Sequence, residues 1–161
     1  MFSSALIAGV VLVFLVILIN AWGCNPRNIK VEECADRAVL SGAVAEINHI
    51  DKIQNKKYAL DAYQKKAFRK EEYVYFLRLK NTIKMDRLYF NSFYIVSAEP
   101  LSLERMQDMP VQLTYKRRCL KNFFYSAGIE GRRYRDPDKE KGLLFINNLP
   151  VLKIEKIEII N

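Results

Sequence analysis

The pattern of hydrophobic and polar positions divides the chain into an uncharged N-terminal segment and a highly charged remainder. Residues 1–26 contain no Asp, Glu, Lys or Arg, and residues 5–22 are apolar except for Asn20. A helix of about 20 residues is roughly 30 Å long, which matches the hydrocarbon core of a bilayer. The pattern therefore predicts a single transmembrane α-helix that acts as a retained signal anchor. Its membrane-facing positions are represented by Ala5, Leu12, Phe14, Ile19 and Trp22.

The residues that follow this segment bear on its orientation and processing. Arg27, Lys30 and Arg37 come after the apolar run and no basic residue precedes it, so the positive-inside rule favours a cytoplasmic domain over an exported one. Residues 21–24 partly match a lipoprotein cleavage box, which makes Cys24 a candidate for lipidation in the exported alternative. The predicted organisation is a transmembrane anchor at 1–24, a linker leading into the domain at 25–37, and a small basic β-rich domain at 38–161.

From residue 38 onward the pattern is typical of β-strands. Apolar and polar residues alternate over 38–50, where Gly42 indicates a bulge or a sharp curl. Further strands are predicted at 73–79, 88–96, 111–115, 142–146 and 151–159, with one helix between the first two strands. This order is similar to that of an OB-fold or a related small barrel. The predicted fold class is a transmembrane helix followed by a small mainly-β domain, OB-like or α+β, with five to seven strands and one helix.

The positive charge of the chain is unevenly distributed. The 161 residues carry a net charge of +8, and the surplus is concentrated in two segments. Residues 52–70 carry seven basic residues against one acidic residue, with Leu60, Tyr63 and Ala67 at helical spacing. They predict a basic helix that lies on anionic headgroups or, alternatively, an ordinary helix that closes one end of a barrel. The residues of the candidate membrane-surface helix are Lys56, Lys57, Lys65, Lys66, Arg69 and Lys70.

The second basic segment, residues 116–135, interleaves basic and aromatic side chains. It also has seven basic residues against one acidic residue. Arg, Tyr and Phe are enriched in the centres of protein interfaces, and the same composition suits a groove for single-stranded nucleic acid. The candidate interaction surface comprises Lys116, Arg117, Arg118, Lys121, Phe123, Phe124, Tyr125, Arg132, Arg133 and Arg135.

The residues with reactive side chains do not predict an enzyme. Cys34 and Cys119 form a candidate disulfide in an exported protein and would be reduced in the cytosol. The cysteines lack zinc-ligand spacing, His49 is the only histidine, and the chain has no nucleophile-elbow or phosphate-loop motif. We therefore infer no catalytic residue, no metal site, no cofactor and no small-molecule substrate.

These patterns favour a membrane-anchored accessory or scaffold subunit whose basic β domain binds partner proteins or headgroups at the membrane surface. The expected partners are the membrane and other protein subunits of a membrane complex. An exported lipoprotein or anchored envelope domain with a Cys34–Cys119 disulfide is the first alternative. A membrane-tethered barrel that binds single-stranded nucleic acid is the second and less favoured one.

Overall fold

Eight β-strands and three short 3-10 helices make up the described part of the chain. The computed structural model describes residues 29, 31–85, 88–120, 125–126, 128–133 and 142–160. The strands are β1 (Val31–His49), β2 (Tyr73–Met85), β3 (Leu88–Ser97), β4 (Pro110–Leu120), β5 (Tyr125–Ser126), β6 (Ile129–Arg133), β7 (Gly142–Ile146) and β8 (Leu149–Ile159). The 3-10 helices are η1 (Ile50–Lys52), η2 (Gln64–Ala67) and η3 (Leu103–Arg105).

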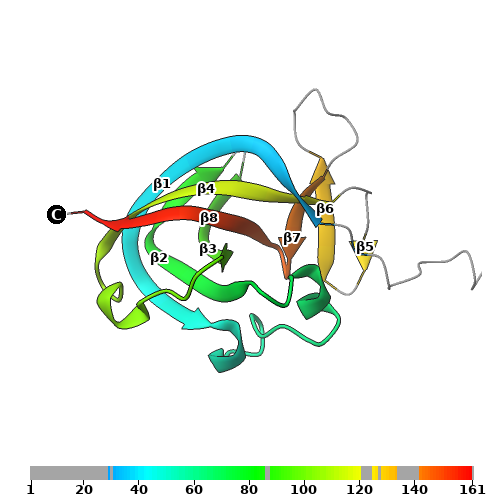
Figure 1. Ribbon diagram of the computed structural model, residues 1–161, viewed down its shortest axis with the longest axis horizontal. Coiled ribbons are helices and arrows are strands. Elements are labelled where there is room, and N and C mark those ends of the chain that lie inside the picture. Colours follow the sequence, from blue (N-terminus) through cyan, green and yellow to red (C-terminus); the bar gives the residue numbers. More distant parts are fainter. Residues whose placement is uncertain are drawn as a thin grey trace, which may run out of the picture.

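Five of these strands close into a barrel. The strand order is β1-β2-β3-β8-β4, and β4 pairs again with β1 to complete the ring. All neighbours in the ring are antiparallel except β3 and β8, whose parallel contact joins Tyr94–Val96 to Val151–Lys153. Strands β5, β6 and β7 extend the sheet from the end of β4, and they lie at one end of the barrel in Figure 1. Because β4 lies beside β1 and β1-β2-β3 follow in order, the barrel has a Greek-key arrangement.

The long strand β1 pairs with two strands because it bends around the barrel, as Figure 1 shows. Its first part pairs with β4 as far as Ala43, and its second part pairs with β2 from Val44. A Cβ atom at Gly42 would collide with the side-chain oxygen of Asn81 and approach Leu79 Cδ1 to 3.0 Å. Glycine therefore permits the close approach of β1 to β2 at the position where β1 changes partner.

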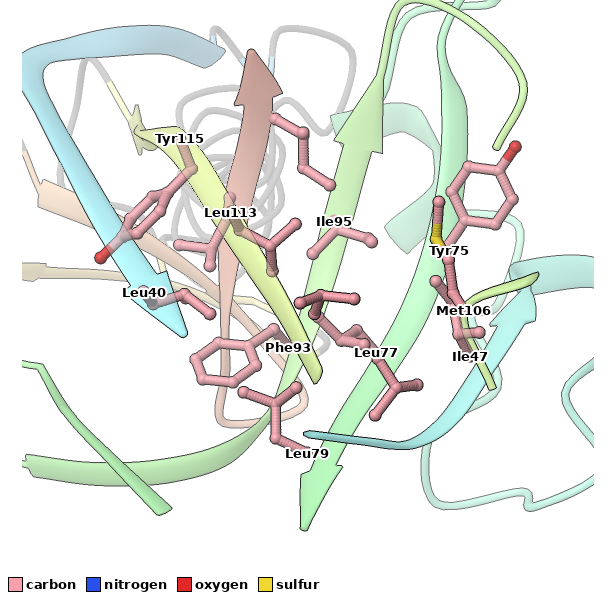
Figure 2. Packing of buried hydrophobic residues seen from close by; sticks show 14 of the residues in the cluster. Leu40, Ile47, Tyr75, Leu77, Leu79, Phe93, Ile95, Met106, Leu113 and Tyr115 are labelled. Atoms are coloured by element: carbon pink, nitrogen blue, oxygen red, sulfur yellow. The ribbon is translucent and has the colours of Figure 1, made fainter. Parts of the chain in front are cut away.

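Two large apolar clusters account for the apolar residues on both faces of the first half of β2, and a third, smaller cluster surrounds Cys119. The barrel interior contains side chains from all five ring strands, and Figure 2 shows Leu40, Leu77 and Phe93 among those that point into it. A second cluster covers the outer face of β2 and β3 and includes Phe76 and Tyr94. Alternate residues of β2 thus enter different clusters over residues 74–77, whereas most of its residues from Arg78 onward are exposed.

The predicted fold class and membrane localisation are corrected by this structure. Within the described residues no helix is long and apolar enough to cross a membrane. The segment with Ala5, Leu12, Phe14, Ile19 and Trp22, together with Cys24, lies outside the described residues. The described chain instead uses its apolar residues in strands that pack on two sides, so the supported class is a mostly β domain. The predicted fold class, a transmembrane signal anchor followed by a domain with one helix, is therefore corrected to a mostly β domain, and the described residues do not support a membrane localisation.

The predicted basic helix between the first two strands is also wrong. The segment that holds Lys56, Lys57, Lys65, Lys66, Arg69 and Lys70 forms only turns and the single-turn η2. The Asp61 carboxylate accepts hydrogen bonds from the backbone N–H groups of Tyr63 and Gln64, at 2.8 and 2.7 Å. Phe68 is already extended, with φ −112° and ψ 148°. The η2 helix therefore ends at Ala67. Ala67 is buried in the second cluster, and the extended Phe68 packs against the same cluster.

Candidate functional site

Those residues of the second basic segment that the structure describes do not lie on one common surface. Lys116 lies on an outer face of the barrel, Arg118 is buried, and Arg132 packs on the ring of Phe145 at 4.2 Å and donates to Asn148 Oδ1 at 2.9 Å. Arg117 interacts with other residues. Lys121, Phe123, Phe124 and Arg135 lie outside the described residues, as do the side chains of Tyr125 and Arg133.

Lys116 belongs to a network of ion pairs across β1, β4 and β8, which we call the ion-paired face. Its Nζ lies 3.7 Å from Glu33 Oε2 and 3.3 Å from Glu155 Oε1. Arg37 pairs with Glu155, and Lys153 pairs with Glu33. The face is defined by Glu33, Arg37, Lys116, Lys153 and Glu155. Hydrogen bonds from Lys153 and Arg37 lower the pKa values of Glu33 and Glu155, respectively. Its positive charges are therefore largely neutralised within the fold.

Arg118 makes a different kind of ion pair. Its Nη2 donates to Glu72 Oε1, and the two side chains are only 3% and 8% exposed. Strand β4 places Arg118 opposite Glu33 of β1, while Glu72 ends the connection that leads into β2. The pair therefore joins the barrel to the β1–β2 connection across a region from which water is almost excluded, where electrostatic interactions are poorly screened.

Beside this pair lies a cavity of about 330 Å³, which we call the cationic pocket. Its lining comes from the start of β1, from η2 and the residues after it, and from β4: Ile29, Val31, Glu32, Lys66, Ala67, Phe68, Arg69 and Arg118. Lys66 and Arg69 are exposed at this site. The backbone N–H of Arg69 donates to Glu72 Oε2 at 3.1 Å, but the side chains of Lys66 and Arg69 form no ion pair with a residue that the structure describes. The pocket thus unites cations from both basic segments, which are far apart in the sequence.

A buried chain of hydrogen bonds holds the β1–β2 connection against the barrel end. Gln64 Nε2 donates to Asn147 Oδ1 at 2.7 Å, and Asn147 Nδ2 donates to the Tyr94 hydroxyl at 3.2 Å. The Tyr94 hydroxyl donates to the backbone oxygen of Tyr58 at 2.7 Å. Burial raises the pKa of Tyr94 to about 12, so this hydroxyl keeps its proton at neutral pH. The connection therefore presents Lys66 and Arg69 from a fixed turn.

A disulfide lies next to the pocket and joins β1 to β4. The structure links Cys34 and Cys119, with a Cα–Cα distance of 5.6 Å and a sequence separation of 85 residues. Cys119 is buried against Leu143 and Phe145. In the strand register Glu32 faces Cys119, so the part of β1 that lines the pocket begins directly beyond the disulfide.

The described residues show no arrangement typical of catalysis or metal binding. His49 Nδ1 accepts a hydrogen bond from the backbone N–H of Asp51 at 3.4 Å, and its ring packs edge-on against Tyr75. Among the residues that the structure describes, no three His, Cys, Asp or Glu side chains lie close enough together to hold a metal ion. His49 therefore has a local structural environment at the end of β1.

Comparisons with family models, with curated proteins and with solved structures give no significant match for this chain. The function is therefore inferred from the geometry of the cationic pocket itself. Sequence analysis missed its apolar wall and the partner of Arg118. One signal was present: Arg117 and Arg118 are consecutive in a strand that is otherwise alternating, and Cys119 and Leu120 follow them. Because successive side chains of a strand point to opposite faces, one of two neighbouring arginines faces inward.

Proposed function

We propose that this protein is a non-enzymatic binding module that docks an acidic segment of a partner protein on the β1–β2 connection and its cationic pocket. The observation that carries the proposal is the contrast in ion pairing. The side chains of Lys66 and Arg69 form no ion pair among the described residues, whereas those of Arg37, Lys116 and Lys153 do. Cations without intramolecular partners attract acidic partners and speed their association.

The connection offers further positive charge around the pocket. Lys52, Lys56, Lys57 and Lys70 are exposed on the same segment, and Lys65 is paired with Asp51 at 2.6 Å. Three of the four acidic residues of the connection are used within the fold: Asp51 pairs with Lys65, Asp61 accepts the N–H of Gln64 at the start of η2, and Glu72 pairs with Arg118. Glu71 is exposed. The segment therefore presents an excess of cations on a rigid support, which suits an accessory or scaffold protein.

The disulfide supports the part of the proposal that concerns the environment. Disulfides form and persist in oxidising compartments and are rare in the cytosol. A cross-strand bond at Cys34 and Cys119 therefore favours a module that folds and binds its partner outside the reducing cytosol. A non-reducing gel and thiol titration of the native protein test this point, and two free thiols at these positions in the natural source would contradict it.

The binding proposal is tested with poly-L-glutamate as a defined acidic probe for the full chain. The double variant Lys66→Glu/Arg69→Glu is compared with Lys84→Glu/Lys156→Glu, which changes the net charge by the same amount on strands β2 and β8. We expect roughly tenfold weaker binding for the first variant and about twofold for the second, measured at low salt. Equal losses would overturn the proposal, because binding would then follow net charge alone. Tighter binding of a single-stranded oligonucleotide than of poly-L-glutamate would also overturn it.

A further inference from the structure

Strand β8 has two neighbouring strands along its first half and only one along its second half. Its parallel pairing with β3 ends where Val96 meets Lys153, and β3 itself ends at Ser97. Its pairing with β4 continues as far as Val111 and Ile159. On the side of β3, no backbone group of the described residues is hydrogen-bonded to β8 beyond Lys153. The second half of β8 therefore has an open edge, which can pair with another strand.

The open edge carries one cation and one anion on its outer face. Lys156 and Glu158 lie opposite Thr114 and Gln112 of β4, and they form an ion pair with each other at 2.6 Å. Their side chains are 62% and 46% exposed. Charged side chains protect a sheet edge from pairing with a second copy when like charges would face each other. Because Lys156 and Glu158 have opposite signs and flank a single residue, Ile157, this edge lacks such protection.

Two copies of the open edge are complementary about a two-fold axis at Ile157. In an antiparallel pair centred on this residue, Lys156 of each copy faces Glu158 of the other, and the two Ile157 side chains face each other. Opposite charges that face each other across two strands stabilise the pair. A two-fold axis repeats every contact, so the register supplies two such charge pairs.

The length of the open edge fits the same register. The pair centred on Ile157 covers residues 154–160 of both copies, so it ends one residue before Lys153, where β3 occupies the edge. The centre of the charge pattern thus coincides with the centre of the open edge. Ile159 and Ile160 are 41% and 38% exposed, and the pairing covers part of this apolar surface at both ends of the stretch.

We propose that the protein forms a symmetric dimer in which the open edges of two β8 strands pair antiparallel about Ile157. The register of β8 against β4 shifts next to Glu155, so regular pairing is confined to the central residues and the dimer is reversible. Arg118 and the cationic pocket lie at the other end of β4, and Figure 1 shows the C-terminal end of β8 far from β5, β6 and β7. Dimerisation therefore leaves both pockets accessible and does not depend on the proposed docking function.

Sedimentation equilibrium of the full-length protein with its disulfide intact, at concentrations up to about 0.5 mM, tests the dimer. Lys156→Glu places two carboxylates opposite each other on both sides of the axis, and Glu158→Lys does the same with two ammonium groups. We expect each variant alone to have a dissociation constant at least about tenfold higher than that of the wild type. Lys84→Glu is the control, because it changes the net charge as Lys156→Glu does but lies on β2. A monomeric wild type, or an equal loss with Lys84→Glu, would overturn the inference.

A mixture of the two variants separates pairing between chains from the ion pair within one chain. The Lys156→Glu chain carries two anions on its edge and the Glu158→Lys chain carries two cations, so a mixed dimer is complementary at both positions. We expect the equimolar mixture to associate about as tightly as the wild type. Both positions are exposed, so the changes cost little stability, and thermal unfolding of each variant verifies its fold. If the mixture associates no better than the separate variants, the inference is overturned.

The dimer and the docking function are tested by separate measurements. Because Lys156 lies on the open edge, binding of poly-L-glutamate is compared at protein concentrations at which the wild type is monomeric. If the mixed variants associate but poly-L-glutamate binding does not depend on Lys66 and Arg69, the dimer stands and the docking proposal is overturned. If poly-L-glutamate binding depends on these two residues but the wild type does not associate, the docking proposal stands and the dimer is overturned.

Discussion

The ion-paired face and the cationic pocket contain similar side chains and have opposite electrostatic character. On the face, Lys116 lies within 4 Å of two glutamates, and Arg37 and Lys153 each pair with one of them. At the pocket, the side chains of Lys66 and Arg69 form no ion pair within the described part of the chain. Net charge therefore says little about where this protein can bind an acidic ligand, because the position of the carboxylates decides which cations remain available.

The difference follows from how the two regions are built. On the face, three neighbouring strands place Glu33, Lys116 and Lys153 side by side through the pairing of β1 with β4 and β4 with β8. The β1–β2 connection has no strand neighbour for most of its length, and only Lys65 among its lysines forms an ion pair with a described residue, Asp51 at 2.6 Å. Its one buried contact of opposite charge, between Glu72 and Arg118, consumes a carboxylate of the connection rather than one of its cations.

Removing one partner of the Arg118–Glu72 pair is expected to have the largest effect. Arg118→Met leaves the Glu72 carboxylate, which is 8% exposed, without a counter-charge, and we expect a loss of about 3–5 kcal/mol in the free energy of unfolding. Chemical denaturation with urea measures this change.

The double variant Arg118→Met/Glu72→Met tests whether the loss of stability comes from the uncompensated buried charge. Replacing both charges by apolar groups of similar length is expected to restore the unfolding free energy to within about 1 kcal/mol of the wild type. If the double variant is as unstable as the single one, the pair does not act through an uncompensated charge, and the link between the barrel and the connection has another origin.

Loss of the disulfide is expected to have the next largest effect and to act mainly at the pocket. Cys34→Ser/Cys119→Ser removes a bond that spans 85 residues, and we expect a loss of about 2–4 kcal/mol in the unfolding free energy. Because Val31 and Glu32 lie directly beyond the bond, hydrogen exchange should increase first in this part of β1. Retained protection at Val31, with loss instead at the ion-paired face, would contradict this assignment.

A substitution at Gly128 is expected to loosen the support of the connection at an intermediate cost. Gly128 has φ +76°, and a Cβ there would lie 2.7 Å from Gln64 Nε2 and 2.8 Å from Asn147 Oδ1. Gly128→Ala therefore costs about 1–3 kcal/mol of unfolding free energy and should weaken binding at the cationic pocket. Gly131→Ala is the control, because its nearest neighbour would be Leu120 Cδ1 at 3.3 Å. If both changes have equal effects in thermal unfolding, any methyl group added in this region lowers the stability, and the contacts of Gly128 with Gln64 and Asn147 are not the cause.

The sequence pattern predicted most strands of the barrel, because alternating apolar residues and β-branched residues identify a strand locally. It placed strands at 73–79, 88–96 and 111–115, and the structure has β2, β3 and β4 there. It did not find that β1 begins at Val31, because residues 31–37 are rich in charge. Those charges belong in a strand only because β4 and β8 supply partners for Glu33 and Arg37. Such pairing is tertiary and leaves no local pattern.

The helix prediction failed for a related reason. Leu60, Tyr63 and Ala67 have helical spacing, yet Asp61 and Gln64 bond to local backbone groups and fix a single turn. Gln64 is then held by Asn147, which lies 83 residues away. The pocket could not be predicted either, since Arg118 and Lys66 approach each other only after the barrel closes. Sequence alone indicated two separate basic segments and gave no reason to join them.

The smallest expected effect belongs to the ion-paired face, and its pH dependence sharpens the comparison with the pocket. The pKa of Glu33 is lowered from its ordinary value of 4.5, first by the hydrogen bond from Lys153. A lowered pKa in the folded state contributes stability that is present above pH 4.5 and is lost as the pH falls through the folded-state pKa. Glu33→Gln should therefore reduce the unfolding free energy by less than about 1 kcal/mol above pH 5 and by nothing at the acid end. Urea titrations at several pH values measure this difference, with Glu104→Gln as the exposed control.

A loss that persists below the folded-state pKa, or that does not shrink with added salt, would mean that Glu33 acts through packing. The ion-paired face would then resemble the buried Arg118–Glu72 pair, and the electrostatic contrast between the two regions would no longer account for where the protein binds.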